Sequence, residues 1–114
     1  MSVSDQQIIA ACSPILESVA YHPENAGERI FLNAYQLWLM LEQVNPDICR
    51  ELEHSYGTAK GKGGGHSVGP IQRIAQALGR CADVETRYMS TKYITVSEFE
   101  PSGYPDCGIF RLHQ

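Results

Sequence analysis

The period of the hydrophobic pattern changes at Asp83, and this change most constrains how the chain can fold. Before Asp83, apolar side chains recur at intervals of three and four residues, which is typical of helices with one buried face. After it, residues 84–89 alternate, residues 93–99 are rich in β-branched and aromatic side chains, and residues 109–112 complete the pattern of strands. Helices followed by strands predict an α+β fold, with N-terminal helices before a small antiparallel sheet or hairpin.

Capping signals predict where the first helix begins. Ser4 followed by Gln7 forms a capping-box pattern, in which each side chain bonds the backbone N–H of the other residue. Pro14 lacks a backbone N–H and crowds the preceding turn. We therefore expect a kink at Pro14, or a helix that ends there and restarts with Ser13 as its cap.

Two further helices are predicted after a short strand at residues 30–31. Asn33 can cap the first helix, Asn45 with Pro46 can begin the second, and Gly57 can end it. The apolar stripe of the first helix consists of Ala34, Leu37, Trp38, Leu41 and Val44. The predicted core joins Trp38 and Leu41 to Ile74, Leu78 and Phe110.

The segment 57–66 holds five of the ten glycines and two lysines. Such a segment buries little apolar surface and loses much conformational entropy on ordering, so we predict a flexible loop. A fourth helix is expected to open at Ser67 and Pro70 and to stop at Gly79. The length of 114 residues suits a single domain, 1–114.

Membrane and secretory signals are missing from the sequence pattern. The longest central apolar run, residues 37–41, is far shorter than the roughly 20 residues of a membrane span. The N-terminus has no basic segment before an apolar run, so it is not typical of a signal peptide. The four cysteines form no Cys-x-x-Cys pair. We therefore predict a cytoplasmic protein with reduced, mostly buried thiols, no metal and no cofactor.

Charge is distributed unevenly along the chain, although the net charge is only −4. Residues 1–54 hold eight acidic and two basic side chains, whereas residues 55–92 hold two acidic and six basic ones. Residues 93–114 hold three acidic side chains and one basic one. A basic middle segment can present a positive face to an anion, although ordinary scatter of surface charge accounts for the same pattern.

The order of the predicted elements resembles a winged helix-turn-helix domain over roughly residues 28–112. The resemblance rests on FLNAYQLW at 31–38, on IQRIAQALG at 71–79, and on the terminal hairpin 93–112, which would form the wing. It implies that the last helix before the hairpin, here 69–80, is a recognition helix for the DNA major groove. The glycine-rich loop is longer than the turn of that family, and the chain is acidic overall.

Two groups of side chains support nucleic-acid binding. Lysines in the glycine-rich loop, beside free N–H groups at the start of a helix, are suited to phosphate, although a solvated connector has the same composition. Arginine and glutamine on one exposed helix side can bond base edges, although both are also common on wet helix surfaces. The predicted nucleic-acid-binding residues are Lys60, Lys62, His66, Arg73, Gln76, Arg80, Arg87 and Lys92.

Two functions remain open at this point. The first is a small DNA-binding protein, for which a regulatory role is one option and whose affinity is modest unless it forms a homodimer. The alternative is a non-enzymatic adaptor or inhibitor whose acidic N-terminal helices face a protein partner. The sequence contains no local signature of a nucleophilic cysteine or of a phosphate-binding Walker loop, so an enzyme is the least favoured class.

Overall fold

The computed structural model describes residues 3–19, 29–59, 69–90 and 106–113. In chain order, the elements are α1 (Asp5–Ser18), β1 (Leu32–Asn33), α2 (Ala34–Val44), α3 (Pro46–Tyr56), α4 (Pro70–Gly79), β2 (Val84–Ser90) and β3 (Asp106–Leu112). The predicted α+β class is confirmed: the described helices precede the main strand pair, β2 and β3, of a small antiparallel sheet, and only the two-residue β1 comes earlier in the chain. None of the described helices combines the length and the apolar character that crossing a bilayer requires.

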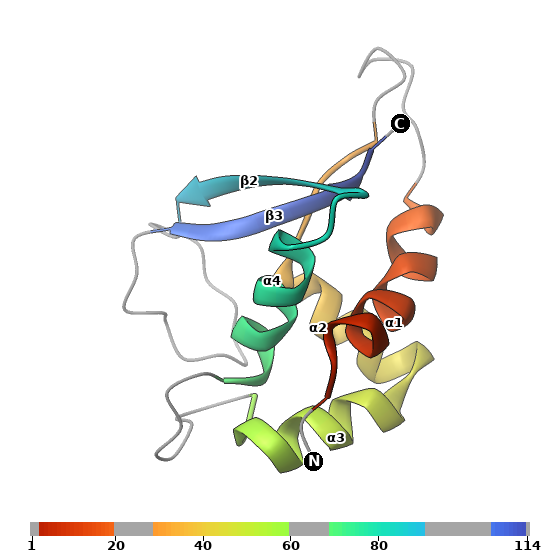
Figure 1. The fold of residues 1–114 in the computed structure, drawn as a ribbon, viewed down its shortest axis with the longest axis vertical. Helices are drawn as coiled ribbons and strands as arrows, with labels where there is room; N and C mark the ends of the chain where they lie inside the picture. The colour runs from red at the N-terminus through yellow and green to blue at the C-terminus, as the bar shows by residue number, and fades with distance from the viewer. Residues whose placement is uncertain (1–2, 20–28, 60–68, 91–105, 114) are drawn as a thin grey trace.

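The sheet has the strand order β1-β3-β2, with both pairings antiparallel. Phe110 of β3 lies between Leu32 of β1 and Thr86 of β2. The helices lie on one side of this sheet, and α3 lies at the end of the molecule farthest from it (Figure 1). α1, α2 and α4 all pack against β3, so the short sheet covers one end of the helical layer.

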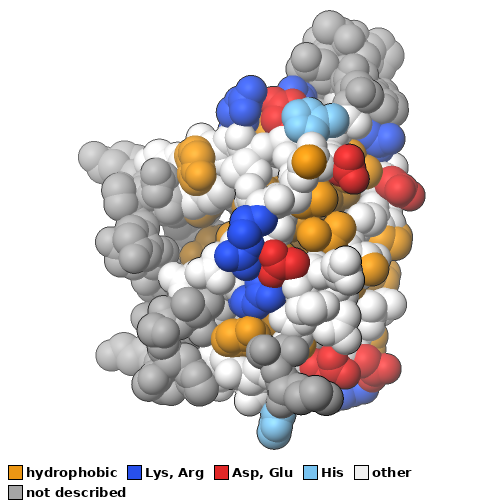
Figure 2. Space-filling view, in the orientation of Figure 1, with side chains coloured by type: hydrophobic (Ala, Val, Ile, Leu, Met, Phe, Trp, Pro, Cys, Tyr) orange, Lys and Arg blue, Asp and Glu red, His pale blue; other side chains and the backbone are white. Residues whose placement is uncertain are grey.

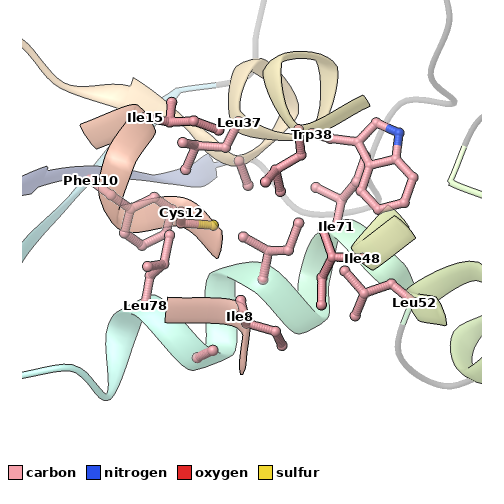
Figure 3. Close-up of a cluster of buried hydrophobic side chains, with 14 of the residues drawn as sticks. Ile8, Cys12, Ile15, Leu37, Trp38, Ile48, Leu52, Ile71, Leu78 and Phe110 are labelled. Atoms are coloured by element: carbon pink, nitrogen blue, oxygen red, sulfur yellow. The ribbon is translucent and has the colours of Figure 1, made fainter. Parts of the chain in front are cut away.

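The core forms where the helical stripes meet the sheet. All five side chains predicted for it are buried, namely Trp38, Leu41, Ile74, Leu78 and Phe110. Figure 3 shows α1, α2, α3, α4 and β3 contributing to one cluster, with Ile8 and Leu78 near Cys12 and Phe110. Burial of these apolar side chains is the main stabilising contribution to the fold.

Four of the predicted helix caps are present. Ser4 and Gln7 exchange hydrogen bonds at the start of α1, and Asn33 does the same with Gln36 at the start of α2. Asn45 accepts from the N–H of Ile48 at the start of α3. Gly57 ends α3 with φ at 92°, a conformation that favours glycine.

Three local expectations are corrected. α1 continues through Pro14, and Ser13 donates to the Ile9 carbonyl at 2.7 Å, so Ser13 is not the cap of a second helix. Val44 is exposed at the end of its stripe. The short strand lies at Leu32–Asn33 rather than at 30–31, because Leu32 is the residue that pairs with Phe110 beside the core.

The predicted strand 93–99 and most of the glycine-rich loop, residues 60–66, lie outside the described residues, as does Ser67. Within the described part, β3 pairs directly with β2, from Val84 opposite Leu112 to Ser90 opposite Asp106. This strand pair follows α4 immediately in the chain.

Candidate nucleic-acid interface

α4 and the residue after it carry three long polar side chains in one row. Gln72, Gln76 and Arg80 are each four residues apart, so they are neighbours along the helix, and all three are exposed. Ile74 and Leu78 on the opposite side are buried. The row therefore faces solvent because the other side of α4 is held in the core.

Arg73 does not share this exposed row, which corrects the expectation from its spacing. Its side chain is only 11% exposed. Its guanidinium donates to the Val3 carbonyl at 2.8 Å and to the Tyr56 hydroxyl at 3.1 Å, and it pairs with Asp5 at 2.7 Å. Arg73 thus joins α4 to the segment before α1 and to the end of α3.

Arg80 reaches the same carboxylate from the exposed side. Its Nε and Nη2 atoms donate to the two oxygens of Asp5 at 2.9 and 3.0 Å, while its side chain stays 61% exposed. We call Asp5, Arg73, Arg80 and Tyr56 the helix cluster. It places two guanidinium groups around one carboxylate, which leaves an excess of positive charge.

The electrostatics of the helix cluster hold Asp5 in its charged form. Hydrogen bonds from Arg80 and then Arg73 lower the pKa of Asp5 below its ordinary value of 3.8. Burial opposes the charge of Arg73, but its bonds to Asp5 and Tyr56 outweigh this and raise the pKa of Arg73. Figure 2 shows basic side chains directly beside an acidic one near the centre of this face, rather than an uninterrupted basic patch.

A second group of charges lies on the sheet. Arg111 binds both carboxylate oxygens of Glu85 at 3.1 and 3.2 Å, and Arg87 pairs with the same carboxylate at 3.1 Å. Arg111 also donates to the Arg29 carbonyl at 3.0 Å and lies over the Phe31 ring, 4.3 Å from its centroid. We call Glu85, Arg87, Arg111 and Phe31 the sheet cluster.

The structure separates Arg87 from the row on α4. Thr86 lies opposite Phe110, whose buried side chain faces the helices. Successive residues of a strand point to opposite faces, so Arg87 lies on the face that is turned away from the helices. Of the remaining predicted contacts, Lys60, Lys62, His66 and Lys92 lie outside the described residues.

Sequence reasoning missed the acidic and aromatic partners of these arginines. Asp5 and Arg80 are 75 residues apart in the chain, and no local pattern relates them. Glu85 and Arg87 were a detectable pair, because residues two apart on a strand share a face. The pairing of Glu85 with Arg111 depends on the strand register, which places these two residues opposite each other.

The four cysteines all lie in described segments and are thiols. Cys12 and Cys49 are buried in the core, and burial, followed by the proximity of Cys49, raises the pKa of Cys12 to about 12. At neutral pH Cys12 is therefore an unreactive thiol. Among the described residues, no group of three His, Cys, Asp or Glu side chains is arranged to hold a metal ion.

Comparison with known proteins yields no relative: the chain matches no protein-family model, and neither a curated protein nor a solved structure is significantly similar to it.

Proposed function

We propose that this protein binds nucleic acid, with duplex DNA as the expected partner, through the exposed row on α4. The observation that carries the proposal is the alignment of Gln72, Gln76 and Arg80 at intervals of four residues on one solvent-facing side. Glutamine can bond adenine and arginine can bond guanine through two hydrogen bonds each. A helix that presents both types in one row has the chemistry for contact with base edges.

The order of the elements supports the same proposal. α4 is followed directly by the β2–β3 pair. The resemblance to a winged helix-turn-helix domain assigns the recognition helix to 69–80 and the wing to 93–112, of which β3 lies within the described residues. Lys60 and Lys62 precede α4 in the chain, and in this proposal they contact phosphates. Arg73 holds α4 in place instead of contacting a base.

In this proposal, Arg80 must give up its ion pair with Asp5 in order to contact the nucleic acid. In the free protein its guanidinium is bound by Asp5 on the surface. A phosphate or a guanine can replace Asp5, since Arg80 is well exposed and Asp5 keeps its pairing with Arg73. Competition from Asp5 makes the expected affinity modest. The proposed location is the cytoplasm, whose reducing conditions would keep the four cysteines as thiols.

Titration of a labelled duplex at several salt concentrations tests the proposal. Binding should weaken steeply with salt, because phosphate contacts release counterions. Arg80→Ala should lower the salt slope by about 1 if Arg80 contacts phosphate, and Lys60→Ala with Lys62→Ala should lower it by up to about 2. Gln76→Ala should instead change the preference among sequences, by about 1–3 kcal/mol for an adenine contact.

Arg50→Ala is the matched control for Arg80→Ala. Arg50 is also an exposed arginine that pairs with an aspartate, Asp47, but it lies on α3 and not on the row. Its removal should leave the affinity almost unchanged. If the folded protein does not bind duplex DNA even at low salt, the proposal is wrong.

The adaptor function remains a second candidate for a specific reason. Each arginine near the proposed interface already has a carboxylate partner, Asp5 for Arg73 and Arg80, and Glu85 for Arg87. α3 also exposes Asp47 and Glu51 to solvent. A stoichiometric complex with a basic protein, together with no affinity for DNA, would favour this function.

A further inference from the structure

β2 has one edge to which no described strand is bonded. It ends the strand order β1-β3-β2, and β3 pairs with its other edge. The N–H of His113 donates to the Asp83 carbonyl at 3.0 Å, so these opposite residues form a hydrogen-bonded pair. Such pairs alternate along an antiparallel ladder. Glu85 and Arg87 therefore bond to β3, whereas Thr86 and Tyr88 direct their backbone groups to the open edge.

Two of the groups along this edge have internal partners. The N–H of Val84 donates to the Cys81 carbonyl at 3.2 Å, and the Arg87 guanidinium donates to the Thr86 carbonyl at 3.0 Å. Beyond these two bonds, no described residue bonds the N–H of Thr86 or the backbone of Tyr88 across the open edge. The Tyr88 side chain is also 72% exposed. An exposed edge of this kind is a template for another strand.

We propose that the partner on this edge is β2 of a second copy of the chain, in an antiparallel pair with its two-fold axis at Thr86. In this register Thr86 lies opposite the partner's Thr86, and Glu85 lies opposite the partner's Arg87. On each side of the axis, on the outer face of the joined sheet, Arg87 then lies opposite the partner's Glu85 as well as pairing with its own Glu85. On the helix-facing side, the exposed Tyr88 lies opposite the partner's Val84, which is already buried within its own chain.

Charge complementarity selects this register over its neighbours. A two-fold axis at Arg87 would place two guanidinium groups opposite each other, which is unfavourable. An axis at Tyr88 would place Arg87 opposite the partner's Met89 and would leave Glu85 without an opposite charge. The axis at Thr86 also bonds the open N–H groups of Thr86 and Tyr88 to the carbonyls of the partner's Thr86 and the partner's Val84. The Thr86 carbonyl accepts this bond in addition to the one from Arg87.

The pairing ends at two copies. After β2 joins the partner's β2, the outer strands among the described residues are the two copies of β1, which is only two residues long. A strand of two residues has few backbone groups with which a further strand can pair. The interface is also isologous, so it closes on itself and does not generate a fibre. This proposal does not depend on the proposed nucleic-acid binding.

Sedimentation equilibrium of the wild-type protein is the first test. The mass should rise with concentration from 12.7 kDa toward twice that value. Arg87→Glu should weaken dimerisation about 10-fold or more, because both cross-strand pairs become like charges. Arg50→Glu makes the same charge change at an exposed site on α3 and should leave dimerisation unchanged. A monomer at every concentration up to about 1 mM, or equal dimerisation of these two variants, overturns the proposal.

Amide hydrogen exchange of the wild-type protein provides a test that needs no variant. The amides of Thr86 and Tyr88 should exchange more slowly as concentration rises, because they become bonded only in the dimer. The Arg87 amide, which bonds to β3 in the monomer, should change little. Tyr88→Pro removes an edge N–H without removing a β2–β3 bond, so it should abolish dimerisation and leave the monomer folded. Concentration-independent exchange at Thr86 and Tyr88 contradicts the proposal.

Discussion

The helix cluster and the sheet cluster have the same arrangement of charged side chains, although they lie on different elements. In each, one carboxylate binds two arginines, of which one is nearly buried and the other is exposed. Arg73 and Arg111 are 11% and 14% exposed, whereas Arg80 and Arg87 are 61% and 64% exposed. The nearly buried arginine also contacts an aromatic ring and a backbone carbonyl distant in the chain.

The difference between the clusters lies in the carboxylate. Glu85 is 17% exposed and Asp5 is 34% exposed. A less exposed carboxylate loses more hydration on folding, so it depends more strongly on its arginine partners. One arginine of each pair therefore joins elements of the fold, while the other stays largely exposed to solvent.

The largest effect is expected from Arg111→Met. The substitution keeps an apolar side chain near Phe31 but leaves Glu85 with only the exposed Arg87 as its partner. Unfolding in urea should show a loss of about 3 kcal/mol. A loss below about 1 kcal/mol would contradict a stabilising role for the nearly buried arginine.

Arg73→Met should cost somewhat less, about 2 kcal/mol, in the same measurement. The bonds to Val3 and Tyr56 are lost, but Asp5 is partly hydrated and keeps both bonds to Arg80. If Arg73→Met lowers the free energy of unfolding more than Arg111→Met does, the exposed fraction of the carboxylate does not determine how much its arginine partner stabilises the fold.

Asp5→Asn should change how stability depends on pH. Because the pKa of Asp5 is lowered in the folded state, its charged form stabilises the protein above the unfolded pKa, near 3.8. This contribution is lost as the pH falls below 3.8 toward the folded pKa. The melting temperature should therefore fall less steeply with decreasing pH for Asp5→Asn than for the wild type. Identical slopes of melting temperature against pH would show that these ion pairs add no stability.

The smallest effects are expected from Arg80→Ala and Arg87→Ala. Each removes one exposed partner of a carboxylate that keeps its nearly buried arginine. Each loss of unfolding free energy should be at most about 1 kcal/mol. Urea unfolding of both variants and of Arg73→Met compares the exposed arginines with a nearly buried one. If Arg80→Ala lowers the free energy of unfolding as much as Arg73→Met does, the exposed and nearly buried arginines do not differ in this respect.

Local signals predicted most of the helices correctly. The cap of α1 at Ser4, the cap of α2 at Asn33 and the end of α3 at Gly57 depend on side-chain and backbone groups within four residues of each other. Such interactions form wherever the chain turns into a helix, so they can be recognised without the rest of the fold. Of the two outcomes expected at Pro14, the restart capped by Ser13 is wrong. α1 continues through the proline, because packing of its apolar side chains on both sides outweighs the lost backbone bond.

The candidate interface was predicted only in part, for a related reason. Helical spacing places Arg73 beside Gln76 and Arg80, yet periodicity does not show which polar side chain lies at the boundary of the core. Arg73 lies at that boundary, where Val3, Asp5 and Tyr56 surround it. Alternation placed Arg87 on a strand, but only the pairing with β3 showed which face it occupies.

The α+β class, four of the helix caps and the five predicted core side chains follow from the amino-acid pattern, because each depends on local bonding or on hydrophobic period. The exposure of each arginine, and the edge of β2 to which no described strand is bonded, depend on the tertiary structure. Asp5 meets Arg73 and Arg80, and Glu85 meets Arg111, across long separations in the chain. Contacts of that kind form only when packing brings the elements together, since a local pattern carries no information about a charge on another element.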